Sequence, residues 1–549
     1  MPAARYDHVV KGCPANRGLQ SGDSHPRGEQ PPPLSNRPQM SAPDKAIIPA
    51  DGAPDAGGGP EMRGHAIRGA AWMMTLRLAV RLLSIANTAI LARLLTPTDF
   101  GLMAMASLAL SVVAVFGVSG EDLALIRLGR PSREYLDSAW TLKIIISFVI
   151  FICALATAPL ARLYFSSIYV ELIVYLISLR VLLDGFMNIG TVYFRINLDF
   201  AKEFRFLVYR KLCDVALVLS CVLMIRNFWG LAIAIVLSKI SEVILSYAMH
   251  PFRPRLRLTK VREIWSFSSW TLLVWLGAYF AGKADEYIVG ATNSPAVMGA
   301  YTVGAEVAVT PTTDLIQPVM RAMFPVYSRL LNDTERLRAA VVLVIGATAS
   351  VCLATGLGVS GIARELTPLL LGPQWEKATS LVFWLGIGGI PVGMNFCIYS
   401  IMNVTNKFRL TTITVWGRLA LLVPTLIVAG RWGGAPAIAA AQAGLGFVAL
   451  FADFFMLRLA VRYSAADLVG CLYRPLAAAL AMVFVLHVVD QMPHLPLLTS
   501  MILKIVTGGI AYLGTLTVAW FFAGRPDGVE ALVFGICARF IRRRAQSWS

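Results

Sequence analysis

The chain has 549 residues, of which 57% are hydrophobic and 15% charged, and its mean hydropathy is +0.65. Soluble globular proteins carry about 25% charged residues, so the composition excludes that class and indicates a polytopic membrane protein. The formal net charge is +17. Positively charged cytoplasmic loops account for this excess, and we expect no nucleic-acid partner.

Motifs for metal, nucleotide or catalytic chemistry are missing from the sequence. The eight cysteines are scattered without a CxxC pair, which predicts neither a zinc site nor a disulfide framework. No GxxxxGK[ST] or HExxH run occurs. The series Gly356, Gly358, Gly361 ends an apolar helix, so we interpret it as helix packing. We therefore expect a protein that is not an enzyme and that holds no cofactor and no metal.

The apolar segments predict an all-α membrane protein with about fourteen transmembrane helices. They lie near 68–94, 98–120, 137–162, 169–193, 204–225, 229–249, 266–290, 297–323, 338–361, 378–402, 409–429, 434–457, 468–489 and 498–522. With the N-terminus in the cytoplasm, twenty Lys and Arg residues fall at cytoplasmic helix ends or loops and six at outer ones. This bias predicts that both termini are cytoplasmic.

The predicted helices divide into two lobes of six helices and a C-terminal pair. The expected parts are a disordered cytoplasmic tail 1–61, an N-terminal lobe 62–249, a basic cytoplasmic linker 250–264, a C-terminal lobe 265–462, helices 13 and 14 in 463–524, and a basic cytoplasmic tail 525–549. The first tail holds 11 of the 29 prolines and no apolar run.

A spaced set of residues predicts that the two lobes are a parallel repeat. Four residues of the N-terminal lobe recur 198 positions later: Trp72, Leu78, Pro97 and Gly101 return as Trp270, Leu276, Pro295 and Gly299. An even number of helices between the copies gives them the same direction in the membrane.

Two arginines inside the first predicted helix are the strongest candidates for a binding site. Arg77, Arg81, Ser84 and Thr88 lie on one helical face. No acid lies within a turn of either arginine, and a charge facing lipid costs at least about 2.5 kcal/mol. We predict that this face meets cargo. The alternative is that Arg81 pairs with an acid on another helix, such as Asp184 or Asp214.

Other charges also lie inside predicted helices. Arg210 and Arg418 are further candidate cations, whereas Arg180 with Asp184 and Lys239 with Glu242 are spaced so that each pair could neutralise itself within one helix. The acids available for ion coupling or gating are Asp285, Glu286, Glu306 and Asp314. The helix that carries Glu306 also holds Pro311 and Pro318, which mark either a moving part or a static kink.

Four stretches resemble a known family: ARLLTPTDFGLMAMA (92–106), GKADEYIVGATNSPAVMGAY (282–301), FPVYSRLLNDTERLR (324–338) and LGPQWEKATSLVFWLG (371–386). They are similar to Wzx-type polysaccharide flippases, in the colanic-acid and exopolysaccharide branch of the multidrug/oligosaccharidyl-lipid/polysaccharide exporter superfamily. The similarity covers about 65–490. Glu286 departs from the family, which often has Asn after the aspartate that Asp285 matches.

The resemblance implies a flippase of the bacterial inner membrane. Its cargo would be an undecaprenyl-pyrophosphate-linked oligosaccharide repeat unit, moved by alternating access for exopolysaccharide or lipopolysaccharide export. A pyrophosphate needs cations in the membrane, which Arg77, Arg81, Arg210 and Arg418 could supply. A polysaccharide polymerase and a chain-length regulator are further candidate partners. The rival interpretations are a drug or small-amphiphile exporter of the same superfamily, a polysaccharide polymerase or ligase, and a non-transporting scaffold.

Overall fold

Long helices make up the fold. A computed structural model of the chain describes residues 80–117, 125, 131–197, 199–261, 269–405, 408–492 and 496–525. These residues all belong to one unit, 66–549, and every regular element among them is helical. The protein is therefore an all-α protein. Arg77, the predicted tail 1–61 and the basic tail beyond Arg525 lie outside the described residues.

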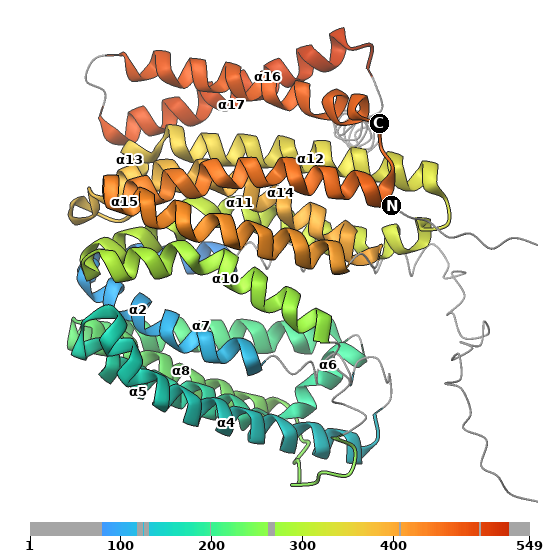
Figure 1. Cartoon of the computed structure of the whole chain (residues 1–549). Helices are drawn as coiled ribbons and strands as arrows, with labels where there is room; N and C mark the ends of the chain where they lie inside the picture. The colour runs from blue at the N-terminus through green and yellow to red at the C-terminus, as the bar shows by residue number, and fades with distance from the viewer. Residues whose placement is uncertain are drawn as a thin grey trace, which may run out of the picture. The chain divides into compact units, whose positions relative to one another are not determined.

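The helices before residue 262 form what we call the N-terminal group (Figure 1). They are a helix over 80–94, α2 (Pro97–Ala114), α4 (Arg133–Phe165), α5 (Ile168–Gly185), α6 (Val192–Ile196), α7 (Phe200–Ile225) and α8 (Phe228–Met249). The helices after residue 268 form the C-terminal group. They are α10 (Ser269–Thr292), α11 (Pro295–Leu330), α12 (Thr334–Gly361), α13 (Ala363–Leu370), α14 (Ala378–Val404), α15 (Phe408–Val461), α16 (Ala465–Asp490) and α17 (Leu497–Phe522).

Each of the fourteen expected spans overlaps one of these helices, and the protein is a multi-pass membrane protein. Within the described ranges, eight helices are long and apolar enough to cross a membrane, or nine if the bent pair Ile168–Gly185 and Ile189–Ile196 is one span. Among the helices outside that set, α7, α10 and α11 carry charges such as Arg210, Lys283 and Glu306. The count of fourteen stays a prediction.

Local sequence signals explain where several helices begin and break. Thr96 caps α2 in a capping box with Asp99, and Pro97 occupies the first helical turn. Ser464 and Asp467 form the same box at α16. Helix α15 breaks at Gly434, whose φ of 61° suits glycine, so that two predicted helices appear as one interrupted element.

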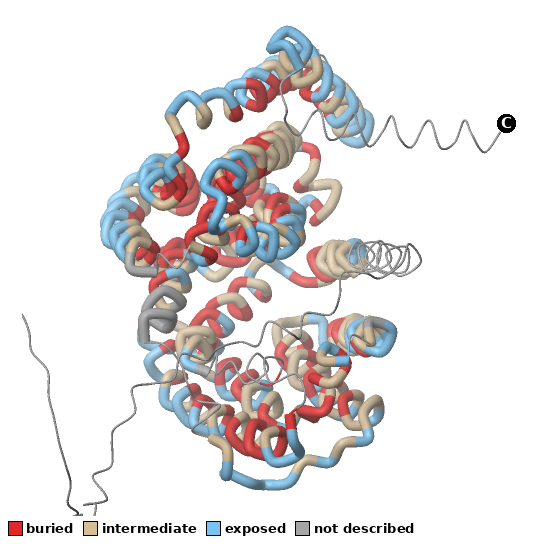
Figure 2. Tube along the Cα trace, turned by 90° about the vertical axis from the view of Figure 1, so that its right-hand side faces the viewer, coloured by how far each residue is buried: buried red, intermediate tan, exposed pale blue. Residues whose placement is uncertain are grey.

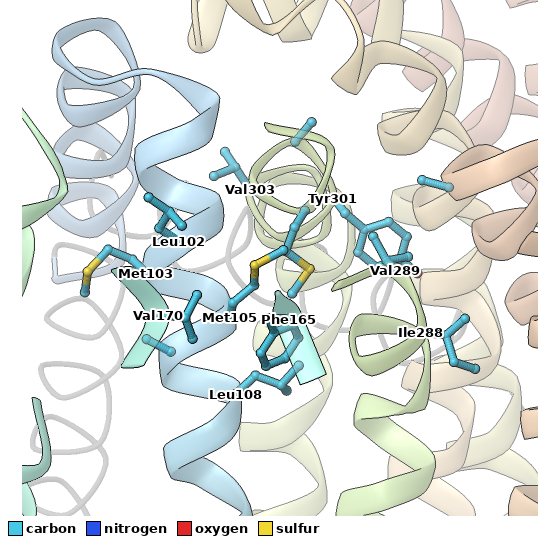
Figure 3. Close-up of a cluster of buried hydrophobic side chains, with 14 of the residues drawn as sticks. Leu102, Met103, Met105, Leu108, Phe165, Val170, Ile288, Val289, Tyr301 and Val303 are labelled. Carbon is cyan, nitrogen blue, oxygen red and sulfur yellow. The ribbon is translucent and has the colours of Figure 1, made fainter. Parts of the chain in front are cut away.

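The two groups meet where α2 crosses α11. A Cβ atom built on Gly101 would lie 1.7 Å from the carbonyl oxygen of Pro295, and one on Gly299 would lie 1.9 Å from that of Pro97. The backbones therefore touch at two glycines that occupy equivalent positions in the predicted repeat. Figure 3 shows the apolar cluster beside this crossing, where Met105 of α2 approaches Tyr301 of α11.

A second set of contacts joins the groups next to this crossing. The C-terminal end of the helix over 80–94 contacts the short helix η3 (Pro373–Trp375). The Nε1 of Trp375 and the Nε2 of Gln374 both donate to the carbonyl of Ala92, at 2.8 and 2.7 Å. Trp375 is fully buried and meets Phe100 edge-on. Neither α13 nor η3 was expected from the sequence, because both are too short to register as spans.

The C-terminal pair α16 and α17 packs on α12 and α13. Lys504 of α17 is buried, with Nζ 2.7 Å from Glu365 of α13 and 2.5 Å from Asp490 at the end of α16. Figure 2 shows exposed residues gathering on the outward faces of the helices and buried ones where helices face one another. This pattern fits helices that are surrounded by lipid and therefore present apolar surface outward.

The described part of the predicted linker runs along the start of α4. The backbone N–H groups of Arg255 and Arg257 donate to Asp137 and Thr141 of α4, both at 2.9 Å. Asn188 holds the beginning of the same segment, because its Nδ2 donates to the carbonyls of His250 and Phe252. The linker is thus fixed to the N-terminal group over 250–261.

Candidate functional site

A cavity of about 1380 Å³ lies among five helices. Its walls come from α2 of the N-terminal group and from α10, α11, α14 and α15 of the C-terminal group. On α14 the lining residues Gly388, Val392, Asn395, Tyr399 and Asn403 follow helical spacing, so one face of the helix forms one wall. The cavity is the candidate site for cargo.

A polar face of α11 forms another wall of the cavity. Glu306, Thr310 and Gln317 line it, as does Arg321 one turn further on. Asp314 does not line the cavity and pairs elsewhere. The prolines Pro311, Pro318 and Pro325 all lie inside the single helix α11.

The structure pairs Arg81 with an acid that the sequence did not suggest as its partner. The Nε of Arg81 lies 2.7 Å from the carboxylate of Asp314 on α11. About two helical turns away, Thr88 donates to Glu306 of α11 at 3.3 Å. The polar face of the first helix therefore meets α11 rather than lipid. The alternative that Arg81 pairs with an acid on another helix therefore holds, with Asp314 in place of the suggested Asp184 or Asp214.

Asp184 and Asp214 form ion pairs with lysines instead. Lys239 of α8 bonds to Asp184 of α5, and Lys143 of α4 lies 3.5 Å from the same carboxylate. Asp214 pairs with Lys211 at 3.1 Å. The interpretation of Arg180 and Asp184 as a pair that neutralises itself therefore fails, since the residue facing Asp184 comes from another helix.

Arg210 belongs to the network that Lys239 organises. Its Nη1 lies 2.8 Å from Glu242, and Glu242 also meets Lys239 at 3.1 Å. The Lys239–Glu242 pair within α8 was expected; its connection to Asp184 and Arg210 was not. Arg210 lies among these charges on α7 and does not line the cavity.

Of the three predicted arginines that the structure describes, Arg418 is the one that lines the cavity. It lies on α15, hydrogen-bonds to the hydroxyl of Tyr399, and has Asp453 as an acidic neighbour. Its Nη2 lies 3.9 Å from the Cβ position of Gly446. Among the described residues, the Nε of Arg418 has no hydrogen-bond partner.

The acids of α10 also reach the cavity. The hydroxyl of Tyr301 donates to Asp285 at 2.6 Å, while Lys283 lies 2.6 Å from Glu286. Both carboxylates are thus engaged by neighbours in the C-terminal group. Together with Glu306 they equal in number the lining cations Lys283, Arg321 and Arg418. The cavity walls described here are formally neutral, whereas a cavity built from arginine was expected.

Several residues of this site were missed by the sequence analysis. Asn395 is 5% exposed and lines the cavity, yet neither polar atom of its amide bonds to any described residue. The Oε1 of Gln442, another lining residue, also lacks a hydrogen-bond partner among the described residues. An unsatisfied buried polar group costs about 1–3 kcal/mol. An amide in the middle of the apolar run 378–404 was a usable signal for Asn395.

Metal chemistry finds no support in the described residues. Within them, no three His, Cys, Asp or Glu side chains are grouped so that they could hold a metal ion. The lining residues instead offer hydrogen bonds from amides, hydroxyls and a guanidinium. Such a surface can bind and release a polar head group without covalent chemistry.

Comparison with known proteins places the chain. A family model described as "Polysaccharide biosynthesis protein" matches residues 90–380, just over half of the chain. An uncharacterized membrane protein in the cps region of Klebsiella pneumoniae is 23% identical over 470 residues, covering 82% of this chain and 95% of that protein. The lipopolysaccharide biosynthesis protein WzxC of Escherichia coli (strain K12) is 19% identical over 388 residues, covering 68% and 77%.

A solved structure shares the fold. Lipid II flippase MurJ in an inward closed conformation superposes with a TM-score of 0.63 at 12% identity, covering 83% of this chain and 100% of that one. At this identity the match concerns the arrangement of the helices. With the family model covering more than half of its length, the chain belongs to the polysaccharide biosynthesis protein family.

Proposed function

We propose that the protein is a flippase for undecaprenyl-pyrophosphate-linked oligosaccharide repeat units in the bacterial inner membrane. Membership of the polysaccharide biosynthesis protein family and a fold shared with a lipid II flippase support this proposal. The observation that carries it is the large cavity with polar groups in its lining, bounded by α2 of the N-terminal group and by four helices of the C-terminal group.

The size of the cavity favours a large head group. Sites for drug-sized ligands measure about 300–1,000 Å³, and this one is about 1380 Å³. Its lining mixes amides, hydroxyls and balanced charges with apolar side chains. A small hydrophobic drug would leave most of these polar groups unpaired. An oligosaccharide offers hydroxyls that match them, which favours sugar cargo over the rival of a drug exporter.

The contact between α2 and α11 supports alternating access. Helix α2 begins at Pro97 and α11 at Pro295, and both starts meet through Gly101 and Gly299. With cytoplasmic termini, this contact lies at the outer side, and the cavity extends from it toward the cytoplasm along α11. In this proposal the cavity is closed toward the outer side of the membrane. Transport requires the contact to part while the cytoplasmic side closes.

The proposed roles of the charges follow their positions. Arg418 contacts the pyrophosphate, because it lines the cavity with its Nε available. Arg81 and Arg210 act through their pairs with Asp314 and Glu242. Asp285, Glu286, Glu306 and Asp314 remain the proposed ion-coupling or gating groups, since the sequence holds no nucleotide-binding motif.

Loss of the gene in the host strain tests the proposal. We expect lipid-linked repeat units to accumulate in the cytoplasmic leaflet and polymer export to stop, with both restored by the wild-type chain and not by Arg418→Ala at equal membrane abundance. Continued export together with an altered resistance to small amphiphiles would favour the drug exporter instead. A polymerase or chain-length regulator that copurifies with the protein would identify further partners.

A further inference from the structure

Several unpaired polar atoms lie on the cavity wall that α14 and α15 form. Both atoms of the Asn395 amide, the Oε1 of Gln442 and the Nε of Arg418 lack hydrogen-bond partners within the described part of the chain. All three residues line the cavity, and they come from α14 and from the two halves of α15. On the α10 side, the Oδ1 of Asp285 also lacks a partner among the described residues, while its Oδ2 accepts from Tyr301 and Glu286 is paired with Lys283.

The fold satisfies buried amides elsewhere. Asn188 is fully buried, and its Nδ2 donates to the carbonyls of His250 and Phe252 while its Oδ1 accepts from the N–H of Gly190. Asn395 is comparably buried at 5% exposure and makes no such bond to the described residues. Native proteins keep few buried polar groups unpaired, so a group of them on one cavity wall points to a bound molecule.

The three side chains are close enough to act on one ligand. Arg418 bonds to Tyr399, which lies one helical turn beyond Asn395 on α14. The Nη2 of Arg418 is 3.9 Å from the Cβ position of Gly446, one turn beyond Gln442 on α15. Each of the two amides therefore lies one helical turn from a residue next to the guanidinium.

The chemistry of this wall suits a sugar. An amide presents a donor and an acceptor side by side, as adjacent sugar hydroxyls or an N-acetyl group require. Phe396 and Val392 beside Asn395 supply apolar surface for the C–H face of a pyranose ring. We infer that Asn395 and Gln442 recognise the sugar attached directly to the pyrophosphate, whose charge Arg418 holds. The inference rests on the proposed function and adds a specificity site to it.

Binding of two probes to the full-length protein in lipid nanodiscs tests the inference. One probe is undecaprenyl pyrophosphate without sugar, and the other is the lipid-linked oligosaccharide extracted from host cells that lack this protein. We expect the wild type to prefer the sugar-bearing probe. Asn395→Leu should weaken binding of that probe about tenfold, the value of two hydrogen bonds between neutral groups, and leave binding of the sugar-free probe unchanged.

Thermal unfolding of the same samples separates recognition from structural support. Asn395→Leu replaces unpaired atoms by apolar ones of similar size, so the unfolding midpoint should stay or rise. Asn188→Leu is the matched control and should lower the midpoint, because it breaks bonds that the fold uses. Gln442→Leu provides a second variant with the same expected loss of preference for sugar.

The possible results decide between the two levels of the proposal. A full preference for sugar in both Asn395→Leu and Gln442→Leu would overturn the inference and leave the flippase proposal intact. Equal binding of the two probes by the wild type would do the same. Failure of both variants to fold would show that the amides are structural and would also overturn the inference. Binding of neither probe by the wild type would overturn both proposals.

Discussion

The run from Leu95 to Gly101 forms the start of α2 and several of the contacts that this helix makes with its neighbours. Thr96 and Asp99 close the capping box that begins α2, and the second carboxylate oxygen of Asp99 accepts from the N–H of Phe228 at 3.0 Å, which fixes the start of α8. Phe100 meets Trp375, and Gly101 allows α11 to approach. The motif therefore joins the two groups of helices at a single point.

Variants of Arg81 and Asp314 can show whether this ion pair only supports the structure or also contacts cargo. Their side chains are 27% and 41% exposed, so the pair contributes about 1 kcal/mol or less. Arg81→Ala should lower the abundance of inserted protein a few-fold, and Arg81→Ala with Asp314→Ala should restore it. Polymer export in the double variant then decides: restored export indicates a structural pair, and lost export indicates contact with cargo. Unchanged abundance and export in Arg81→Ala would contradict both roles.

Lys239 should matter more for stability than any other charge of its network. It is 7% exposed and faces both Asp184 and Glu242. Lys239→Met removes the buried cation that both carboxylates share and leaves Asp184 only Lys143 and Glu242 only Arg210, so we expect a loss of about 1–3 kcal/mol. Arg210→Met is the control, since Glu242 would keep Lys239 and Arg210 is half exposed. Thermal unfolding in one detergent should show a large drop for Lys239→Met and a small one for Arg210→Met; equal drops would refute the network.

The crossing of α2 and α11 gives the predicted repeat a physical meaning. Pro97 and Gly101 contact Gly299 and Pro295 reciprocally, as two copies related by an approximate twofold axis would do. A backbone contact this close has no room for a side chain on either glycine. The spacing of 198 positions predicted the repeat, whereas the contact between its two copies is seen only in the structure.

Gly101→Ala should push the two helices apart and weaken closure of the outer side. In a variant without native cysteines, a cysteine in place of Ser107 on the cavity wall reports access from outside. Labelling by an impermeant thiol reagent should become faster in Gly101→Ala. Gly444→Ala is the control, because a Cβ there meets nothing within 4 Å. If Gly101→Ala labels at the wild-type rate and exports normally, the crossing is not a gate.

The helices were predictable because each combines an apolar run with local end signals. The predicted span 378–402 corresponds to α14 (Ala378–Val404), and the gap between 429 and 434 coincides with the break at Gly434. Ion pairs between helices were not predictable, since partners such as Arg81 and Asp314 are far apart in sequence and meet only through packing. The amide of Asn395 carried a signal, yet only the structure shows that its atoms lack partners.

Topology of the whole chain is the next prediction. Arg257 lies in the segment fixed along α4, and Arg431 lies just before the break in α15; both are exposed. With cytoplasmic termini and fourteen spans, Arg257 is cytoplasmic and Arg431 faces outward. Reporter fusions at these two residues should give opposite signals. The same signal from both would require a different number of spans between them.

Translocation of cargo by the isolated protein is the most direct test of the central claim. Purified protein is reconstituted into liposomes that carry the host's undecaprenyl-pyrophosphate-linked oligosaccharide with a fluorescent sugar, and an impermeant quencher is added outside. Liposomes with wild-type protein should lose the protected fraction of fluorescence, whereas those with Arg418→Ala should keep it. If wild-type liposomes keep the same protected fraction as protein-free liposomes, under an ion gradient of either direction, the account of this protein as a flippase is contradicted.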